Sequence, residues 1–175
     1  YGEDNFLRKC KEVGIDGLII SDLPYPENIS FVKKCRNSDV SFIQLIAPTT
    51  SKERISKINE YADEMLYYIS MLGVTGSALK NSPQDIQKKY KEIKKICSDK
   101  AIVVGFGITK DVIKHFKNDT MGLVIGSQIC STIENSIKNG QNSDAIVAST
   151  KLYKSLLNEL EKWIGLLVGK KLELK

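Results

Sequence analysis

Short apolar runs alternate with segments of helical periodicity from one end of the chain to the other. Runs rich in β-branched and other apolar residues predict strands at about 17–21, 41–46, 65–70, 101–104 and 122–125. Nearly continuous apolar character is typical of parallel strands that are buried on both faces. The pattern therefore predicts a succession of βα units.

Helical segments with recognisable start signals separate these strands. The helices are predicted at about 4–13, 84–97, 109–116, 128–137 and 144–164, and the last carries a long amphipathic stripe. Their start signals include Asp4, Ser82 with Pro83, and Thr109. Thr50 with Glu53 forms a capping-box pattern, which predicts the start of a further helix. Gly14 is expected to end the first helix.

Five parallel strands with crossover helices fit two α/β architectures, and the pattern alone leaves both open. One is a doubly wound open sheet, which five units would complete. The other is a (β/α)8 TIM barrel, which takes about 250 residues and eight strands, so that about three N-terminal units would lie upstream. In either case we expect residues 1–175 to form a single domain.

Composition narrows the classes of function. The net charge of +5 comes from lysines spread along helices between acidic residues, which predicts solvated helix faces and no nucleic-acid surface. The apolar runs are too short to cross a membrane, and the start at Tyr1 carries no signal peptide, so the sequence is expected to begin in mid-protein. Four isolated cysteines and a single histidine, His115, predict buried thiols and no metal site.

Poor strand formers that can present polar groups to a ligand follow every predicted strand. They are Ser21-Asp22, 47–50, Ser70, Gly105-Phe106-Gly107 and Gly126-Ser127. In both candidate folds ligands bind at the carboxyl ends of the strands. Gly126-Ser127 also leads directly into a helix, whose first amide groups favour an anion. Together with Gly107 this pair predicts a phosphate site, and close packing at strand ends is the alternative explanation.

The residues and the order of the motifs resemble those of the tryptophan synthase alpha subunits. The strings are G-I-D-G-L-I-I at 14–20, D-L-P at 22–24, L-I-A-P-T-T at 45–50, Y-Y-I-S at 67–70, G-V-T-G at 73–76 and G-F-G-I at 105–108. The similarity runs from residue 1 to about residue 164, and residues 165–175 lie outside it. The resemblance implies the TIM barrel, of which this chain would supply one leading helix and five of the eight βα units.

The resemblance also implies a substrate and the residues that bind it. The substrate would be indole-3-glycerol phosphate, with its phosphate held at Gly76, Gly107, Gly126 and Ser127. Tyr67 and Phe106 would line the pocket for the indole and glycerol parts, although core packing is an alternative role for both. Asp22 lies at the mouth of the implied barrel, where it can bond a loop or the substrate. Thr75 would support a lid over the site, although 73–76 also fits an ordinary glycine-rich turn.

The implied reaction is a retro-aldol cleavage that releases indole and glyceraldehyde 3-phosphate in the cytoplasm. Its catalytic glutamate and aspartate belong to the second strand and the following loop of the family, so no catalytic pair is expected in this chain, which alone would be inactive. The implied partner is a beta subunit that carries pyridoxal phosphate, in an α2β2 assembly, while this chain needs no cofactor. The alternatives are a catalytically inactive remnant that binds phosphate and docks on the partner, another phosphosugar barrel, and a doubly wound regulatory domain.

Overall fold

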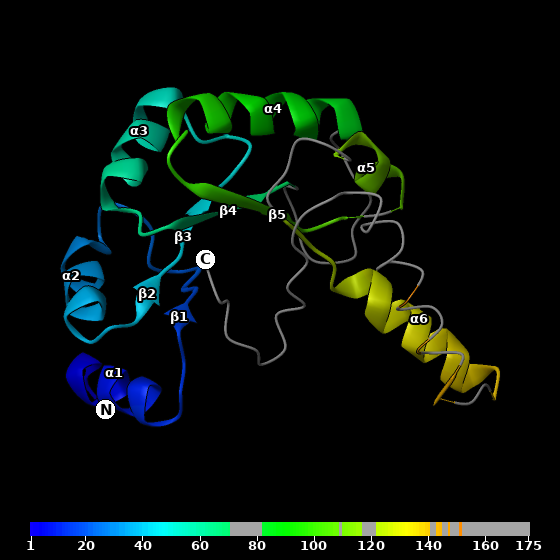
Figure 1. Ribbon diagram of the computed structural model, residues 1–175, viewed down its shortest axis with the longest axis horizontal. Helices are drawn as coiled ribbons and strands as arrows, with labels where there is room; N and C mark the ends of the chain where they lie inside the picture. The colour runs from blue at the N-terminus through cyan, green and yellow to red at the C-terminus, as the bar shows by residue number, and fades with distance from the viewer. Residues whose placement is uncertain are drawn as a thin grey trace.

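The computed structural model describes residues 1–70, 82–108, 110–116 and 122–140, together with 143, 144, 147 and 151. Helices and strands alternate along these residues, as Figure 1 shows. In chain order they are α1 (Glu3–Glu12), β1 (Gly17–Leu18), α2 (Ile29–Asn37), β2 (Ser41–Phe42), β3 (Gln44–Ile46), α3 (Lys52–Tyr61), β4 (Met65–Ile69), α4 (Pro83–Ile96), β5 (Ala101–Gly105), α5 (Lys110–His115), β6 (Gly122–Val124) and α6 (Ser127–Lys138). The predicted helix at 144–164 lies mostly outside the described residues.

All described strands pair in parallel and in the order of the chain. β1 pairs with β2, and β3, β4, β5 and β6 form a four-stranded sheet in that order. Between the two sheets the amide of Ile43 donates to the carbonyl of Leu18 over 2.9 Å. A doubly wound sheet reverses its strand order at a switch point, and no such reversal occurs among the described strands. The sequential order is that of a (β/α)8 barrel.

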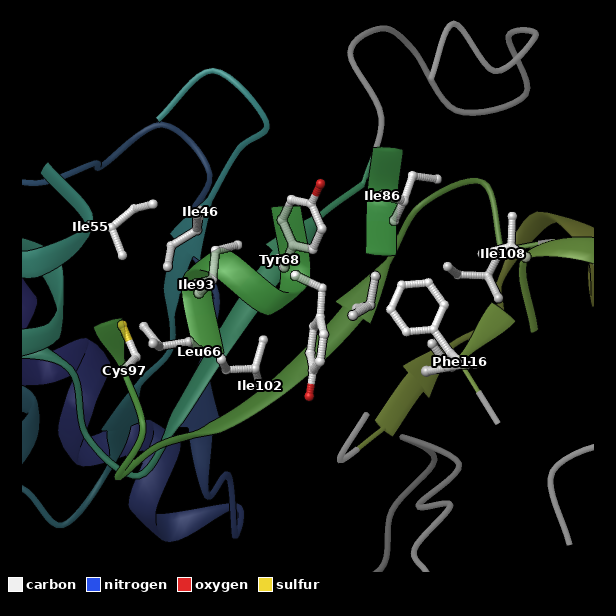
Figure 2. Packing of buried hydrophobic residues seen from close by; sticks show 14 of the residues in the cluster. Ile46, Ile55, Leu66, Tyr68, Ile86, Ile93, Cys97, Ile102, Ile108 and Phe116 are labelled. Carbon is white, nitrogen blue, oxygen red and sulfur yellow. The ribbon is translucent and has the colours of Figure 1, made fainter. Parts of the chain in front are cut away.

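The helices that follow β3, β4 and β5 cover one face of the four-stranded sheet (Figure 1). Leu66 and Tyr68 of β4, and Ile102 and Val104 of β5, pack in one apolar cluster with side chains of α3, α4 and α5, as Figure 2 shows. Because successive side chains of a strand point to opposite faces, Tyr67 lies on the inner face, away from these helices. The outer cluster thus fixes which side chains face the interior of the barrel.

A second apolar cluster joins α1, α2 and β2. Its buried members are Leu7, Cys10, Phe31, Val32, Cys35, Val40 and Phe42. Phe31 and Phe42 meet edge to face, with ring centroids 6.0 Å apart, which is a favourable geometry for two aromatic rings. The first helix of the chain is therefore held by packing against its neighbour.

Three of the four cysteines are buried thiols, as predicted. Cys10, Cys35 and Cys97 are buried, and burial raises the pKa of Cys35 and of Cys97 to about 11. The prediction was wrong for Cys130, which is exposed on α6. Within the described residues no cluster of three or more histidine, cysteine or acidic side chains can hold a metal ion.

The start signals of the helices were only partly predicted. Ser82 begins α4 as expected, and it forms a capping box with Asp85. The helix α3 starts one residue later than the sequence indicated, because Ser51 accepts the amide of Arg54 while the hydroxyl of Thr50 accepts the amide of Ala47. A loop contact thus competes for the Thr50 side chain.

The ends of α1 also differ in part from the prediction. Asp4 lies inside the helix, and Gly2 occupies the capping position without a side-chain hydrogen bond. Gly14 follows the helix with a φ of 75°, a conformation in which glycine is favoured. The predicted stop is therefore confirmed, and the predicted cap is wrong.

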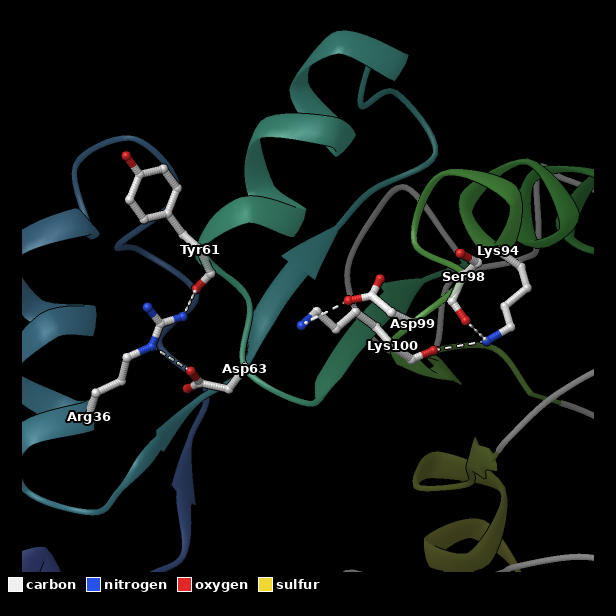
Figure 3. A network of polar contacts seen from close by, with 7 residues as sticks. All are labelled: Arg36, Tyr61, Asp63, Lys94, Ser98, Asp99 and Lys100. Carbon is white, nitrogen blue, oxygen red and sulfur yellow. Dashed lines mark hydrogen bonds and ion pairs between the residues drawn. The ribbon is translucent and has the colours of Figure 1, made fainter.

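The second predicted strand is divided, because its first half pairs with β1 and its second half with β4. At the division the Asp63 carboxylate accepts the amide of Phe42 over 3.0 Å and the guanidinium of Arg36 over 2.6 Å. Arg36 also donates to the carbonyl of Tyr61 over 3.0 Å (Figure 3). These three hydrogen bonds of Asp63 and Arg36, here called the Asp63 clamp, join α2 and β2 to the loop that precedes β4.

On the far side of β4, the loop between α4 and β5 is closed by a lysine (Figure 3). The ammonium group of Lys94 donates to the carbonyls of Ser98 and Lys100 over 3.3 and 3.0 Å. Cationic side chains near the end of a helix stabilise its last carbonyls and the chain that follows. Both the Asp63 clamp and this contact lie at the amino ends of the strands, opposite the carboxyl ends where ligands bind in barrels.

We predict that Asp63→Ala lowers the free energy of unfolding by about 1–3 kcal/mol, because it leaves the buried amide of Phe42 without its acceptor. Urea unfolding of both proteins measures the change. The matched control is Glu60→Ala, which removes the partner of Lys57 in an exposed ion pair of 3.0 Å. Its effect is expected to stay within about 0.5 kcal/mol. Equal losses in the two variants would contradict a special role for the Asp63 clamp.

Candidate functional site

The carboxyl ends of β4, β5 and β6 lie side by side at one edge of the sheet. In the register of the sheet Ile69 pairs with Gly105, and Gly105 pairs with Val124. Ser70, Phe106 and Ile125, which directly follow these three strands, therefore leave the sheet at the same level. This alignment brings together three of the strand ends that the sequence had marked as candidate ligand contacts.

The loop after β5 has an unusual backbone. Phe106 has a φ of 69° and Gly107 a φ of 63°, so two successive residues adopt the left-handed conformation. Glycine does so freely, whereas a bulky residue such as phenylalanine is strained by about 1–3 kcal/mol. Phe106 is 39% exposed at the end of the sheet.

Tyr67 supports this turn from the inner face of β4. Its ring meets that of Phe106 edge to face, with centroids 6.3 Å apart and an interplanar angle of 83°. Only 7% of Tyr67 is exposed, and burial raises the pKa of its hydroxyl. Tyr67 thus holds the exposed ring of Phe106 in place.

Gly105 leaves the space in which the Tyr67 ring lies. A Cβ atom built on Gly105 would fall 1.7 Å from the Tyr67 hydroxyl oxygen and 2.3 Å from the ring carbon that carries it. No side chain at position 105 is compatible with this placement of the ring. The first glycine of the G-F-G motif therefore provides room for an aromatic side chain.

The loop after β6 leads directly into α6. Gly126 is the residue that precedes the helix, Ser127 is its first residue, and both are exposed. The first turn of α6 contains no acidic residue. The first amide groups of a helix generally lack an acceptor within it, although in α6 the amide of Ile129 donates to the Gly126 carbonyl over 2.9 Å. The positive end of the helix dipole favours an anion at this turn. The geometry suits a phosphate group.

The structure places Asp22 in the loop after β1, where it is exposed. β1 is separated from β5 in the strand order by the divided strand and by β4. Among the described residues no hydrogen bond or ion pair joins Asp22 to Tyr67 or Phe106. Thr75 and Gly76 lie outside the described residues.

The chemistry of this edge is one of binding and orientation. The stretches 65–70, 101–108 and 122–128 contain amides, hydroxyls and aromatic rings, and they contain no aspartate, glutamate or histidine. Carboxyl groups and imidazoles are among the commonest general acids and bases of enzymes. These stretches can hold an anion beside an aromatic ring, and they supply no carboxyl group or imidazole.

Comparison with known proteins identifies the family. The sequence profile of the tryptophan synthase alpha chain matches residues 1–160. The tryptophan synthase alpha chain of Pelagibacter ubique is 54% identical over 142 residues, which cover 81% of this chain and 53% of the relative. That of Methanocaldococcus jannaschii is 37% identical over 82% of this chain and 51% of its own length. The chain belongs to the tryptophan synthase alpha chain family.

Solved structures of alpha subunits agree with this assignment. The subunit from Legionella pneumophila superposes with a TM-score of 0.73 at 26% identity, over 92% of this chain and 58% of its own. A tryptophan synthase α2β2 complex from Pyrococcus furiosus gives 0.71 at 27% identity, over 90% of this chain and 61% of the matched chain. The chain thus spans about half the length of the curated relatives above, and it shares the TIM barrel of the family with a partial set of βα units.

The profile match confirms the resemblance that the motifs indicated. It covers residues 1–160, and the motifs predicted similarity from residue 1 to about residue 164. The roles of the individual site residues remain predictions, and the structure describes six of the eight. It brings Tyr67 and Phe106 into contact, and it places Gly107, Gly126 and Ser127 at neighbouring strand ends. Ser70 and Gly105 were predicted only as strand ends that can present polar groups to a ligand. Their contacts with the Phe106 turn and with the Tyr67 ring were not predicted, since no sequence signal shows what a strand end touches.

We predict that Gly105→Ala lowers the free energy of unfolding by about 1–3 kcal/mol, because the added methyl group displaces the Tyr67 ring. Gly122→Ala is the matched control on the adjacent strand, where the nearest atoms to a Cβ are methyl groups of Val103 at 3.5 and 3.8 Å. Ordinary contact at these distances keeps its effect within about 0.5 kcal/mol. Urea unfolding and the near-ultraviolet circular dichroism of the tyrosines distinguish the two. A Gly105→Ala protein with unchanged stability and spectrum would show that the Tyr67 ring does not occupy this space.

Proposed function

We propose that this chain provides the phosphate-binding and ring-binding side of a tryptophan synthase alpha subunit, a lyase of tryptophan biosynthesis. The complete subunit would cleave indole-3-glycerol phosphate to indole and glyceraldehyde 3-phosphate in the cytoplasm. The observation that carries the proposal is the alignment of the Phe106–Gly107 turn with the first turn of α6 in a chain of this family.

The phosphate group would lie between these two loops. Gly107, Gly126 and Ser127 would contribute backbone amides and one hydroxyl, and the dipole of α6 favours the dianion. Gly76 would add a further amide from the loop in which Thr75 supports a lid. The absence of an acidic side chain from the first turn of α6 supports this placement.

The indole ring would pack against Phe106. This residue is 39% exposed at the carboxyl end of β5, and its ring meets that of Tyr67 edge to face. Two aromatic rings attract each other in offset or edge-to-face geometry beyond what burial alone provides. Asp22 would lie at the mouth of the barrel and bond a loop or a substrate hydroxyl.

Proton transfer would come from outside this chain's described residues. In the proposed reaction one carboxyl group moves protons at the indole ring and the glycerol hydroxyl, and a second carboxylate stabilises positive charge on the indole N–H. The glutamate and aspartate for these roles would lie in family segments that precede the matched region. The contribution of this chain is to bind and orient the substrate, and we infer that it does not turn over substrate by itself.

The proposed partner is a tryptophan synthase beta subunit in an α2β2 assembly. The Pyrococcus furiosus neighbour, which belongs to such a complex, supports this proposal. Pyridoxal phosphate would reside in the beta subunit, and this chain would need no cofactor or metal. No helix within the described residues is long and apolar enough to span a membrane.

A second candidate function uses the same residues without chemistry. A protein that retains the phosphate site and the partner surface but lacks the acidic pair would bind a phosphosugar and dock on the beta subunit. The absence of carboxylates from the stretches 65–70, 101–108 and 122–128 favours this candidate for the isolated chain. A measurement of indole release from indole-3-glycerol phosphate distinguishes the lyase from the binding protein.

We predict that this chain alone releases no indole from indole-3-glycerol phosphate, and that a chimera with the preceding part of the Pelagibacter ubique relative does. The relative is 54% identical over the matched region, so the added βα units should find matching strand edges. Indole formation is measured with and without a beta subunit. A folded chimera that binds glycerol 3-phosphate and releases no indole would support the binding function and contradict the lyase.

We further predict that Ser127→Asp in the chimera raises the KM for indole-3-glycerol phosphate about tenfold or more, because a carboxylate then competes with the phosphate at the start of α6. An acidic residue in a first turn stabilises the helix, so loss of fold does not explain the effect. Ser131→Asp, an exposed position one turn later, is the matched control and should leave KM nearly unchanged. Equal KM values for the two variants would place the phosphate elsewhere.

A further inference from the structure

Ser70 is a fully buried polar residue directly after β4, and its side chain contacts the loop that follows β5. Its hydroxyl donates to the carbonyl of Gly105 over 2.9 Å and to the carbonyl of Phe106 in a shorter contact. Its backbone amide also donates to Gly105 over 2.9 Å. A hydroxyl carries a single proton, so the side chain bridges the two carbonyls as a three-centre bond.

The turn that Ser70 contacts needs to be held. Phe106 has a φ of 69°, a conformation that strains a bulky side chain. Hydrogen bonds within the protein stabilise a strained turn, most of all where their loss would leave a buried carbonyl unpaired. The Ser70 contacts therefore act against the strain at Phe106.

The same contacts fix the direction of an amide group. In a planar trans peptide the carbonyl and the following N–H point in opposite directions. The Phe106 carbonyl accepts the Ser70 hydroxyl, so the N–H of Gly107 points away from that hydroxyl. β6, which Gly126 and α6 follow, lies on the other side of β5 from β4.

We propose that Ser70 is a positioning residue of the phosphate site. This proposal rests on the function proposed above. Its hydroxyl holds the Phe106–Gly107 peptide so that the Gly107 amide and the first amides of α6 converge on one anion. Ser70 itself lies behind the turn and does not touch the ligand. Without the hydroxyl the peptide relaxes toward a conformation with negative φ at Phe106, and the Gly107 amide turns away.

A purely structural role for Ser70 makes a different prediction. Ser70→Ala removes one oxygen from a fully buried site and leaves the packing of β4 against β5 in place. If the hydroxyl only filled space, stability would change slightly and anion binding would not change. The positioning role instead predicts a loss of affinity together with a changed environment at Gly107.

The test is a titration of the ¹⁵N-labelled chain with inorganic phosphate, followed by the amide signals of Gly107, Gly126 and Ser127. In the unsubstituted chain we expect all three signals to shift together. Ser70→Ala should weaken phosphate binding about tenfold or more, because a charge-assisted hydrogen bond is lost, and the Gly107 signal should no longer follow the others. Ser70→Thr keeps the hydroxyl and should restore both.

The controls separate fold, positioning and function. Ser136→Ala removes a hydroxyl from another buried serine, on α6, and should leave phosphate affinity unchanged. Urea unfolding of each variant shows whether it is folded. Should Ser70→Ala not fold, Ser70→Cys fills the same space with a weak donor and replaces it in the comparison.

Two outcomes overturn the proposal in distinguishable ways. Unaltered phosphate affinity and an unaltered Gly107 shift in folded Ser70→Ala or Ser70→Cys would overturn the role of Ser70 and leave the phosphate site standing. A chain in which phosphate shifts none of the three amides would overturn the phosphate site of the proposed function, and the role of Ser70 with it.

Discussion

The burial of one face of β4 and β5 against α3, α4 and α5 is the interaction on which the rest of the structure depends. Leu66, Tyr68, Ile102 and Val104 enter this cluster from alternate positions of two neighbouring strands. Side chains alternate along a strand, so the same burial turns Tyr67 to the interior of the barrel. A shift of one residue in either strand would exchange the two faces. The packing of the outer face thus sets the orientation of the site.

The site itself combines strain with its compensation. Phe106 adopts a left-handed conformation that presents its ring and the next amide at the end of the sheet. Tyr67 and Ser70, both from the neighbouring strand or its end, hold the turn by a ring contact and by hydrogen bonds. Strained residues persist where the surrounding structure over-determines them, and they concentrate at binding sites. The ring contact and the hydrogen bonds use no carboxyl group or imidazole, in keeping with the proposed division between substrate binding in this chain and proton transfer elsewhere.

The opposite ends of the strands serve stability. The Asp63 clamp joins the two apolar clusters where the second strand is divided, and Lys94 closes the loop before β5. In both contacts a charged side chain forms hydrogen bonds with backbone groups, and Asp63 also pairs with Arg36. Both lie at the amino ends of the strands, opposite the candidate ligand site. This separation, with binding at the carboxyl ends and stabilising contacts at the amino ends, is general in barrels of this kind.

The sequence by itself determined the order and type of most elements, because apolar periodicity and caps such as Ser82 with Asp85 act over a few residues. It also determined the family, since ordered motifs carry that signal without any knowledge of contacts. It did not determine the division of the second strand, the capping of α3 by Ser51 or the exposure of Cys130. These depend on partners distant in the chain, as do the fit of Tyr67 over Gly105 and the bridge from Ser70 to the Phe106 turn. Only the tertiary structure decided them, because the pairing of neighbouring strands sets which side chains meet. Local sequence does not encode which residues, distant in the chain, become neighbours in the sheet.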